Sequence, residues 1–190
     1  MSGSSKTSSD FYNYYKLIED CAENKKDLII SNGLAEHAVY LMTAMFRYAK
    51  NHIRLFSGEL PDEVRRESQT IKIYSNEELL MAAENFLRME GSRLDILVQE
   101  GENFESRIFI QTLKKKHEEG VIKGSVNLKI SEALCGISSH FMVIDNSGYR
   151  LETDHNHTKA VANFGDSNTA RKLGEIFNTF FHNANEILSV

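Results

Sequence analysis

The chain has 190 residues, of which 41% are hydrophobic and 26% are charged, and its formal net charge at pH 7 is −5. This length suits a single domain with a sizeable core, and the composition is that of a globular protein rather than a disordered or fibrous one. The net negative charge argues against nucleic acid wrapping around the whole surface, because such binding depends on neutralising phosphates. One basic groove on an acidic body would still be compatible with it.

The sequence offers no membrane anchor or secretory signal. No apolar run approaches the roughly 18 to 20 residues that are needed to cross a bilayer, and the first residues, Met1 to Lys6, lack the apolar stretch of a signal peptide. We therefore expect a cytoplasmic protein. Cys21 and Cys135 stand in different segments and do not form a Cys-x-x-Cys motif, so neither a disulfide framework nor a thiolate metal site is expected.

The first third of the chain predicts a strand, a helix and a second strand behind an N-terminal helix. Residues 1–9 are small and polar, which is typical of a flexible leader, and a single domain is expected from residue 10 to residue 190. Asp10 is a suitable N-cap for a helix with an aromatic stripe. Apolar spacing then predicts strands at 28–30 and 53–56 with a helix between them. A crossover of this length favours a parallel pair of strands.

The same alternation of strand and helix continues in the middle of the chain. Residues 71–74 resemble a strand or a lead-in to a helix, and Ser75 with Glu78 forms a potential capping box for that helix. Residues 94–98 predict a further strand. A helix is expected from 104 to 116, where the lysines of its last turns suit the negative end of the helix dipole.

The last third is richer in strands. Strands are predicted over 121–130, 141–145, 149–153 and 159–164. The turn residues Asn146-Ser147-Gly148 favour a tight hairpin between the second and third of these strands. A final helix shows a wide apolar face from 170 to 188. The predicted fold is therefore α/β, with a mixed sheet that is flanked by helices on both faces.

One segment of the last third has the spacing of a catalytic motif. It runs Ser138-Ser139-His140-Phe141-Met142-Val143-Ile144-Asp145, and Ala162-Asn163-Phe164-Gly165 follows it. These residues resemble the signature of the phospholipase D superfamily, which is a His, any residue, a Lys, four residues and an Asp, with a Gly-Ser-x-Asn further on. Aligned on Asp145, Ser138 takes the place of the His and His140 that of the Lys. The resemblance implies a degenerate, single-half member that lacks the catalytic His and Lys.

The resemblance also implies roles and partners. In that family the histidine attacks phosphorus, and the site lies between two halves of one chain or between two subunits. A homodimer, or pairing with a related second subunit, is therefore expected. Asp145 would orient the catalytic groups, and Asn163 would help to hold phosphate. Ser138 is a poor nucleophile without an adjacent base, and His140 lies roughly 6 to 7 Å away along the strand, which favours a pseudoenzyme over an enzyme.

Basic residues of the predicted strands are candidate phosphate ligands. Because alternate residues of a strand face the same way, Arg150 and the strand lysines Lys129 and Lys159 would line a groove over Asp145. Isolated basic residues on strands also keep sheet edges soluble, which is the alternative interpretation.

A metal site is a weaker candidate. Asp154, His155 and His157 are of the types that zinc or manganese binds, and they alternate in an extended segment. A metal site needs a further ligand from elsewhere, and the pattern favours exposed turn residues over a metal site. We expect no cofactor.

Three functions remain open from the sequence. The first is a non-catalytic phospholipase-D-like binding subunit that acts in a complex on nucleic acid or a phosphate-bearing ligand. Resemblance to small single-half members of bacterial defence systems implies an anti-phage role for it. The second is a divergent phosphodiesterase or nuclease that uses His140 and Asp145. The third is a scaffold that binds proteins through its aromatic N-terminal helix and apolar C-terminal helix.

Overall fold

The computed structural model describes residues 4–66, 69–101, 104–154 and 159–190. An eight-stranded sheet runs through the molecule in the order β1-β9-β8-β7-β2-β5-β6-β10. Its strands are β1 (Ile30–Asn32), β2 (His52–Ser57), β5 (Arg93–Val98), β6 (Ser125–Ile130), β7 (Phe141–Ile144), β8 (Gly148–Asp154), β9 (Lys159–Asn163) and β10 (Asn185–Ser189). Strands β2, β5 and β6 are parallel, and all other neighbours are antiparallel. The predicted mixed sheet is confirmed.

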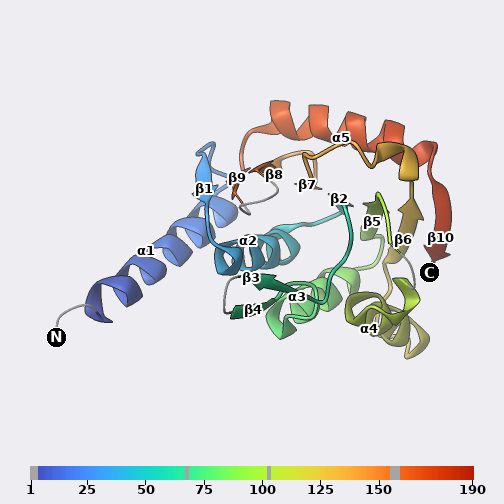
Figure 1. The fold of residues 1–190 in the computed structure, drawn as a ribbon, viewed down its shortest axis with the longest axis horizontal. Coiled ribbons are helices and arrows are strands. Elements are labelled where there is room, and N and C mark those ends of the chain that lie inside the picture. Colours follow the sequence, from blue (N-terminus) through green and yellow to red (C-terminus); the bar gives the residue numbers. More distant parts are fainter. Residues whose placement is uncertain (1–3, 67–68, 102–103, 155–158) are drawn as a thin grey trace.

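Helices cover both faces of the sheet (Figure 1). The helices are α1 (Ser4–Glu23), α2 (Ala35–Tyr48), α3 (Glu77–Leu87), α4 (Ile108–Glu118) and α5 (Ser167–His182), with short 3-10 turns at Phe104–Ser106 and Glu132–Leu134. Helices α2, α3 and α4 lie on one face and α5 on the other. None of the described helices combines the length and apolar character that a bilayer span requires.

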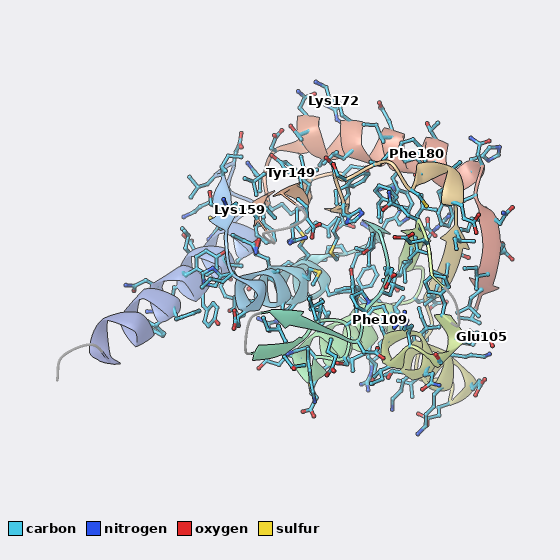
Figure 2. The ribbon with its side chains drawn as sticks, in the orientation of Figure 1. Glu105, Phe109, Tyr149, Lys159, Lys172 and Phe180 are labelled. Atoms are coloured by element: carbon cyan, nitrogen blue, oxygen red, sulfur yellow. The ribbon has the colours of Figure 1, made fainter. Side chains whose placement is uncertain are left out.

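Two apolar layers result, one on each face of the sheet. The larger includes Phe46 and Phe109 beneath the helices α2 to α4, and the smaller includes Phe56 and Phe177 beneath α5. Figure 2 shows Lys172 projecting from the outer side of α5, whereas Phe180 lies toward the sheet. Burial of both sheet faces explains the nearly continuous apolar runs of the central strands.

The N-terminal helix begins earlier than expected. Helix α1 starts at Ser4 rather than at Asp10, so its first turns come from residues 1–9, the segment that was expected to be a flexible leader. Its aromatic stripe packs on α2, where the rings of Tyr15 and Tyr40 stack with centroids 4.0 Å apart. In Figure 1 the N-terminal end of α1 projects away from the body of the molecule.

The predicted parallel pairing of the first two strands is wrong. Strand β1 pairs antiparallel with β9 at one margin of the sheet, with Asn32 opposite Ala160, and three strands lie between it and β2 in the sheet. The parallel partner of β2 is β5, and the connection between them contains α3. A three-residue strand has too few ladder bonds to choose its partner locally, so the position of β9 decides where β1 lies.

A hairpin that the sequence did not reveal lies between β2 and α3. Its strands are β3 (Glu63–Arg66) and β4 (Gln69–Lys72). The expected capping box at Ser75 is also wrong, because Asn76 caps α3 by accepting hydrogen bonds from two amides of the first turn. The Ser75 hydroxyl instead donates to the Asp62 carbonyl at the base of the hairpin, at 2.7 Å.

The C-terminal helix is shorter than predicted. Helix α5 is capped by the Asp166 carboxylate, which accepts from the Thr169 amide, and it ends at His182. Residues 185–189, expected on its apolar face, instead form β10, which pairs antiparallel with β6 at the second margin of the sheet.

Candidate functional site

The motif segment lies in the middle of the sheet. Strand β7 is bordered by β8 and β2, so the Phe141 to Ile144 tract is central in the sheet. His140 precedes this strand and Asp145 follows it. At about 3.3 Å per residue the two side chains start roughly 16 Å apart, at opposite ends of the strand. The motif is therefore divided between two separate environments.

Asp145 fastens the turn at one end of β7. Its backbone is in the left-handed region, with φ of 50°. Its carboxylate accepts three backbone hydrogen bonds, from the amides of Lys50 (2.6 Å), Asn51 (2.8 Å) and His52 (2.9 Å), where the chain enters β2. These contacts join the turn to the start of β2, and the expected role of Asp145 in orienting catalytic groups stays a prediction.

Asn163 has a similar structural role at the same end of the sheet. It is fully buried, and its strand position lies opposite Tyr149 of β8. Its amide donates to the Asp27 carboxylate at 2.7 Å, and its carbonyl oxygen accepts from the amides of Gly165 (2.8 Å) and Asp166 (2.9 Å). These contacts brace the entry to α5, and the expected phosphate contact of Asn163 stays a prediction.

A pocket lies at the other end of β7. It has a volume of about 530 Å³ and opens where β2 and β5 end and β7 begins. Its polar lining includes Gln99, Ser138, His140, Arg150 and Glu152. Its apolar lining includes Met42, Leu55, Val64, Ile73, Tyr74 and Ile137. A concave, mostly apolar site with a few converging polar groups is what small-molecule ligands occupy.

Both ring nitrogens of His140 face hydrogen-bond acceptors. The Gln99 amide nitrogen donates to the carbonyls of Leu134 and Ile137, which turns its oxygen toward His140 Nε2 at 2.7 Å. Nδ1 lies 3.2 Å from the Glu152 carboxylate. Only a ring that is protonated on both nitrogens can donate to both acceptors at once.

Glu152 and Arg150 form a buried ion pair beside this ring. Arg150 Nη1 lies 3.1 Å from Glu152 Oε1. Burial alone would raise the pKa of Glu152, but the His140 hydrogen bond and the Arg150 charge outweigh it and lower the pKa to about 2. Arg150 is only 5% exposed, and its Nε has no hydrogen-bond partner among the described residues. A buried donor of this kind is costly unless an acceptor meets it.

The predicted basic groove does not form. Arg150 lies opposite Met142 on the face that α2 covers, and it lines the pocket. Lys129 is on the other face, with its ammonium group 4.8 Å from the centre of the Phe181 ring of α5. Lys159 is exposed at the start of β9 (Figure 2), next in sequence to Ala160, which is buried. The structure therefore keeps Arg150 as a candidate ligand residue and separates both lysines from it.

The proposed metal ligands lie mostly outside the described residues. Asp154 ends β8, whereas His155 and His157 fall in the segment 155–158, which is not described. Within the described residues, no three His, Cys, Asp or Glu side chains come together as a metal site requires.

Ser138 occupies the position that aligns with the nucleophilic histidine of the family motif. It is exposed and lines the pocket. The ring nitrogens of the neighbouring His140 lie within hydrogen-bond distance of Gln99 and Glu152.

Sequence reasoning missed Gln99 and Glu152. Glu152 follows Arg150 by two residues in a predicted strand, and the alternation of a strand places both side chains on one face. This two-residue spacing is the signal by which the sequence could have revealed Glu152. No comparable signal pointed to Gln99, which comes from the loop after β5.

Comparison with solved structures identifies the architecture. Nuc, a phospholipase D family member from Salmonella typhimurium, is 13% identical, with a TM-score of 0.55 over 84% of this chain and 97% of Nuc. NucT from Helicobacter pylori is 12% identical, with a TM-score of 0.57 over 84% of this chain and 99% of NucT. The fold is phospholipase D-like.

A third solved structure is similar over more of the chain. TrmBL2, an archaeal chromatin protein with a novel mode of DNA binding, is 14% identical, with a TM-score of 0.55 over 96% of this chain. The chain spans 64% of TrmBL2, which is less than two thirds of its length. No protein-family model and no curated protein sequence matches the chain. At these identities the likeness establishes the phospholipase D-like fold and not an activity.

Proposed function

We propose that this chain is a non-catalytic binding subunit that holds a phosphate-bearing ligand at Arg150. The deciding observation is the guanidinium Nε of Arg150, a buried donor without a hydrogen-bond partner among the described residues. A phosphate oxygen in the pocket would be the acceptor that this donor lacks. Arginine forms strong, directional hydrogen bonds with phosphate, which favours this ligand over a neutral acceptor.

The charges around Arg150 support an anionic ligand. Glu152 remains ionised, because its pKa is lowered to about 2, and it offsets one positive charge. Arg150 supplies one positive charge, and a ring of His140 that is protonated on both nitrogens would supply a second and leave a net charge of about +1. His140 would then provide the positive charge of the lysine whose position it occupies.

The same contacts favour binding over catalysis. A phosphoryl-transfer site needs a nucleophile and a group that activates it. Ser138 is exposed, and the ring nitrogens of His140 are engaged by Gln99 and Glu152. Asp145, the second residue of a divergent phosphodiesterase, serves the turn at the far end of β7.

Nucleic acid is a second candidate ligand. The likeness to TrmBL2 favours this candidate, because the structure of TrmBL2 shows a mode of DNA binding and its match covers 96% of this chain. We propose that the chain acts in a complex, as a homodimer or with a related second subunit, and we retain anti-phage defence as its expected setting. Measurement of the oligomeric mass in solution tests the assembly directly.

Titration with inorganic phosphate tests the binding proposal. We expect saturable binding by calorimetry and by ³¹P NMR, and loss of at least tenfold in affinity in the double variant Arg150→Met/Glu152→Gln, which removes both partners of the buried ion pair. The conservative variant Arg150→Lys keeps the charge and tests whether the directional Nε donor is needed.

Turnover assays test the absence of catalysis. We expect no cleavage of DNA, RNA or a small phosphodiester, with or without manganese. Cleavage that Ser138→Ala or His140→Gln abolishes, while Ser139→Ala leaves it intact, would contradict the proposal. If the folded wild-type chain does not bind phosphate, the proposal that it holds a phosphate-bearing ligand at Arg150 is wrong.

A further inference from the structure

We infer that the occupant of the pocket is a small organic phosphate monoester with a compact apolar group, rather than a nucleic acid strand. This inference rests on the proposed function and extends it from a phosphate site to a ligand class. It follows from the shape of the pocket, from the apolar wall opposite Arg150 and from the charges at the pocket mouth.

The pocket is larger than a phosphate group needs. Its volume of about 530 Å³ lies within the range of roughly 300 to 1,000 Å³ that is typical of small-molecule sites. Phosphate bound at Arg150 would fill only the inner, polar end. The remaining volume requires an organic group attached to that phosphate.

The β3–β4 hairpin supplies an apolar wall for this group. Val64 of β3 and Ile73 just after β4 line the pocket and remain half-buried. Met42 of α2 and Leu55 of β2 extend the apolar lining on the side of the sheet. An organic group placed here would remove the partly exposed surfaces of the hairpin from water, which stabilises the complex in proportion to the apolar area buried.

Tyr74 adds an uncharged polar group to this wall. Its side chain is buried, and burial raises its pKa to about 12, so the hydroxyl stays protonated at neutral pH. The wall therefore presents aliphatic carbon and an aromatic ring, without a charge that would repel an apolar ligand group.

The mouth of the pocket is acidic. Glu59 and Glu100 line the pocket and are exposed, unlike the buried Arg150. The nearest countercharge to Glu59 is Arg107, at 3.8 Å. A nucleic acid strand that crossed the mouth would bring several phosphates to these carboxylates, whereas a monoester inserts its single phosphate beyond them.

A ligand series separates this inference from the proposed function. The probes are inorganic phosphate, a nucleoside 5′-monophosphate, a short alkyl phosphate and a single-stranded oligonucleotide of twelve nucleotides, all measured by calorimetry at one salt concentration. We expect at least one monoester to bind about tenfold more tightly than inorganic phosphate, because its organic group buries apolar surface. The nucleoside and alkyl arms distinguish the two sources of a monoester.

Hairpin variants test where the additional affinity arises. Val64→Ser and Ile73→Ser should each remove most of the advantage of the monoester and leave the affinity for inorganic phosphate unchanged within twofold. Met81→Ser is the matched control, because Met81 is 64% exposed on α3 and does not line this pocket. It should change neither affinity.

Each outcome has a defined consequence. If inorganic phosphate does not bind, the proposed function fails and this inference with it. If inorganic phosphate binds but both monoesters bind no more tightly, the proposed function survives and the inference is wrong. Tighter, strongly salt-dependent binding of the oligonucleotide than of either monoester overturns the inference in favour of a nucleic acid strand.

Discussion

The two ends of strand β7 differ in what their motif residues do. At one end, Asp145 accepts hydrogen bonds from three consecutive backbone amides, and every oxygen of its carboxylate is used within the fold. At the other end, His140 borders a pocket in which the Arg150 Nε has no partner among the described residues. The Asp145 carboxylate therefore contacts the backbone of the fold, whereas His140 lies where a ligand can enter.

This difference separates a contact within the sheet from contacts that border a ligand pocket. The Asp145 carboxylate joins the end of β7 to the start of β2. The His140 ring contacts Gln99 and Glu152 beside the pocket, so a change at this position would alter the chemistry of the pocket. Variants at each end test whether the two ends are independent.

The largest expected effect is at the structural end. Asp145→Ala removes the acceptor of three amide hydrogen bonds and places alanine at a positive φ. We expect the free energy of unfolding to fall by about 3 kcal/mol, measured by urea denaturation. Phosphate affinity of the remaining folded protein should be unchanged, because the pocket lies at the other end of the strand.

Asp145→Asn is the matched control. Asparagine keeps one oxygen acceptor and tolerates a positive φ, so the expected loss is only about 1 kcal/mol. A clear loss of phosphate affinity in the folded Asp145→Asn variant would show that the two ends are coupled and would contradict the comparison.

The second effect concerns acid stability at the pocket end. The pKa of Glu152 is lowered from 4.5 to about 2, so its ionised form stabilises the fold above pH 4.5, and this contribution is lost as the pH falls toward 2. The full shift corresponds to about 3 kcal/mol, and partial exposure of the carboxylate reduces the expected contribution to about 2 kcal/mol.

Glu152→Gln should therefore be less stable than the wild type at pH 7, and the two stability curves should approach each other between pH 4.5 and pH 2. Thermal unfolding across this pH range measures the difference. A gap that stays constant with pH would mean that the Glu152 carboxylate is not stabilised by His140 and Arg150.

The sequence predicts best the strands that are buried on both faces. Strand β7 is a wholly apolar run and β5 ends in one, and such buried runs identify central strands without knowledge of their partners. Strand β10 could not be predicted in this way. Ile187 and Leu188 continue the apolar spacing of α5, and only the long-range pairing of Leu188 with Leu128 makes this segment a strand.

The sequence also predicted only part of the candidate site. His140 and Arg150 were identified because a family motif and a strand pattern pointed to them. The contact of Gln99 with His140 joins residues 41 positions apart in the chain, through a loop whose path depends on the packing of β5 beside β2. The structural roles of Asp145 and Asn163 also depend on distant backbone amides and carboxylates that no local pattern reveals.

The smallest expected effects come from two glycines, one at each end of β7. A methyl group on Gly58 would lie 3.0 Å from the His140 Cε1 atom, and a methyl group on Gly174 would lie 3.3 Å from the Asn146 Oδ1 atom beside the Asp145 turn. Gly58→Ala should shift the His140 ring and weaken phosphate binding by about threefold, which corresponds to less than 1 kcal/mol.

Gly174→Ala should leave phosphate binding unchanged. Its effect on the free energy of unfolding should stay within about 1 kcal/mol, because the gain in helix propensity offsets the tight contact with Asn146. Calorimetric titration and urea denaturation of both variants give a two-by-two test. If Gly58→Ala alters stability alone, or Gly174→Ala alters binding alone, the assignment of a ligand end and a structural end to β7 is reversed, because each substitution touches only its own end of the strand.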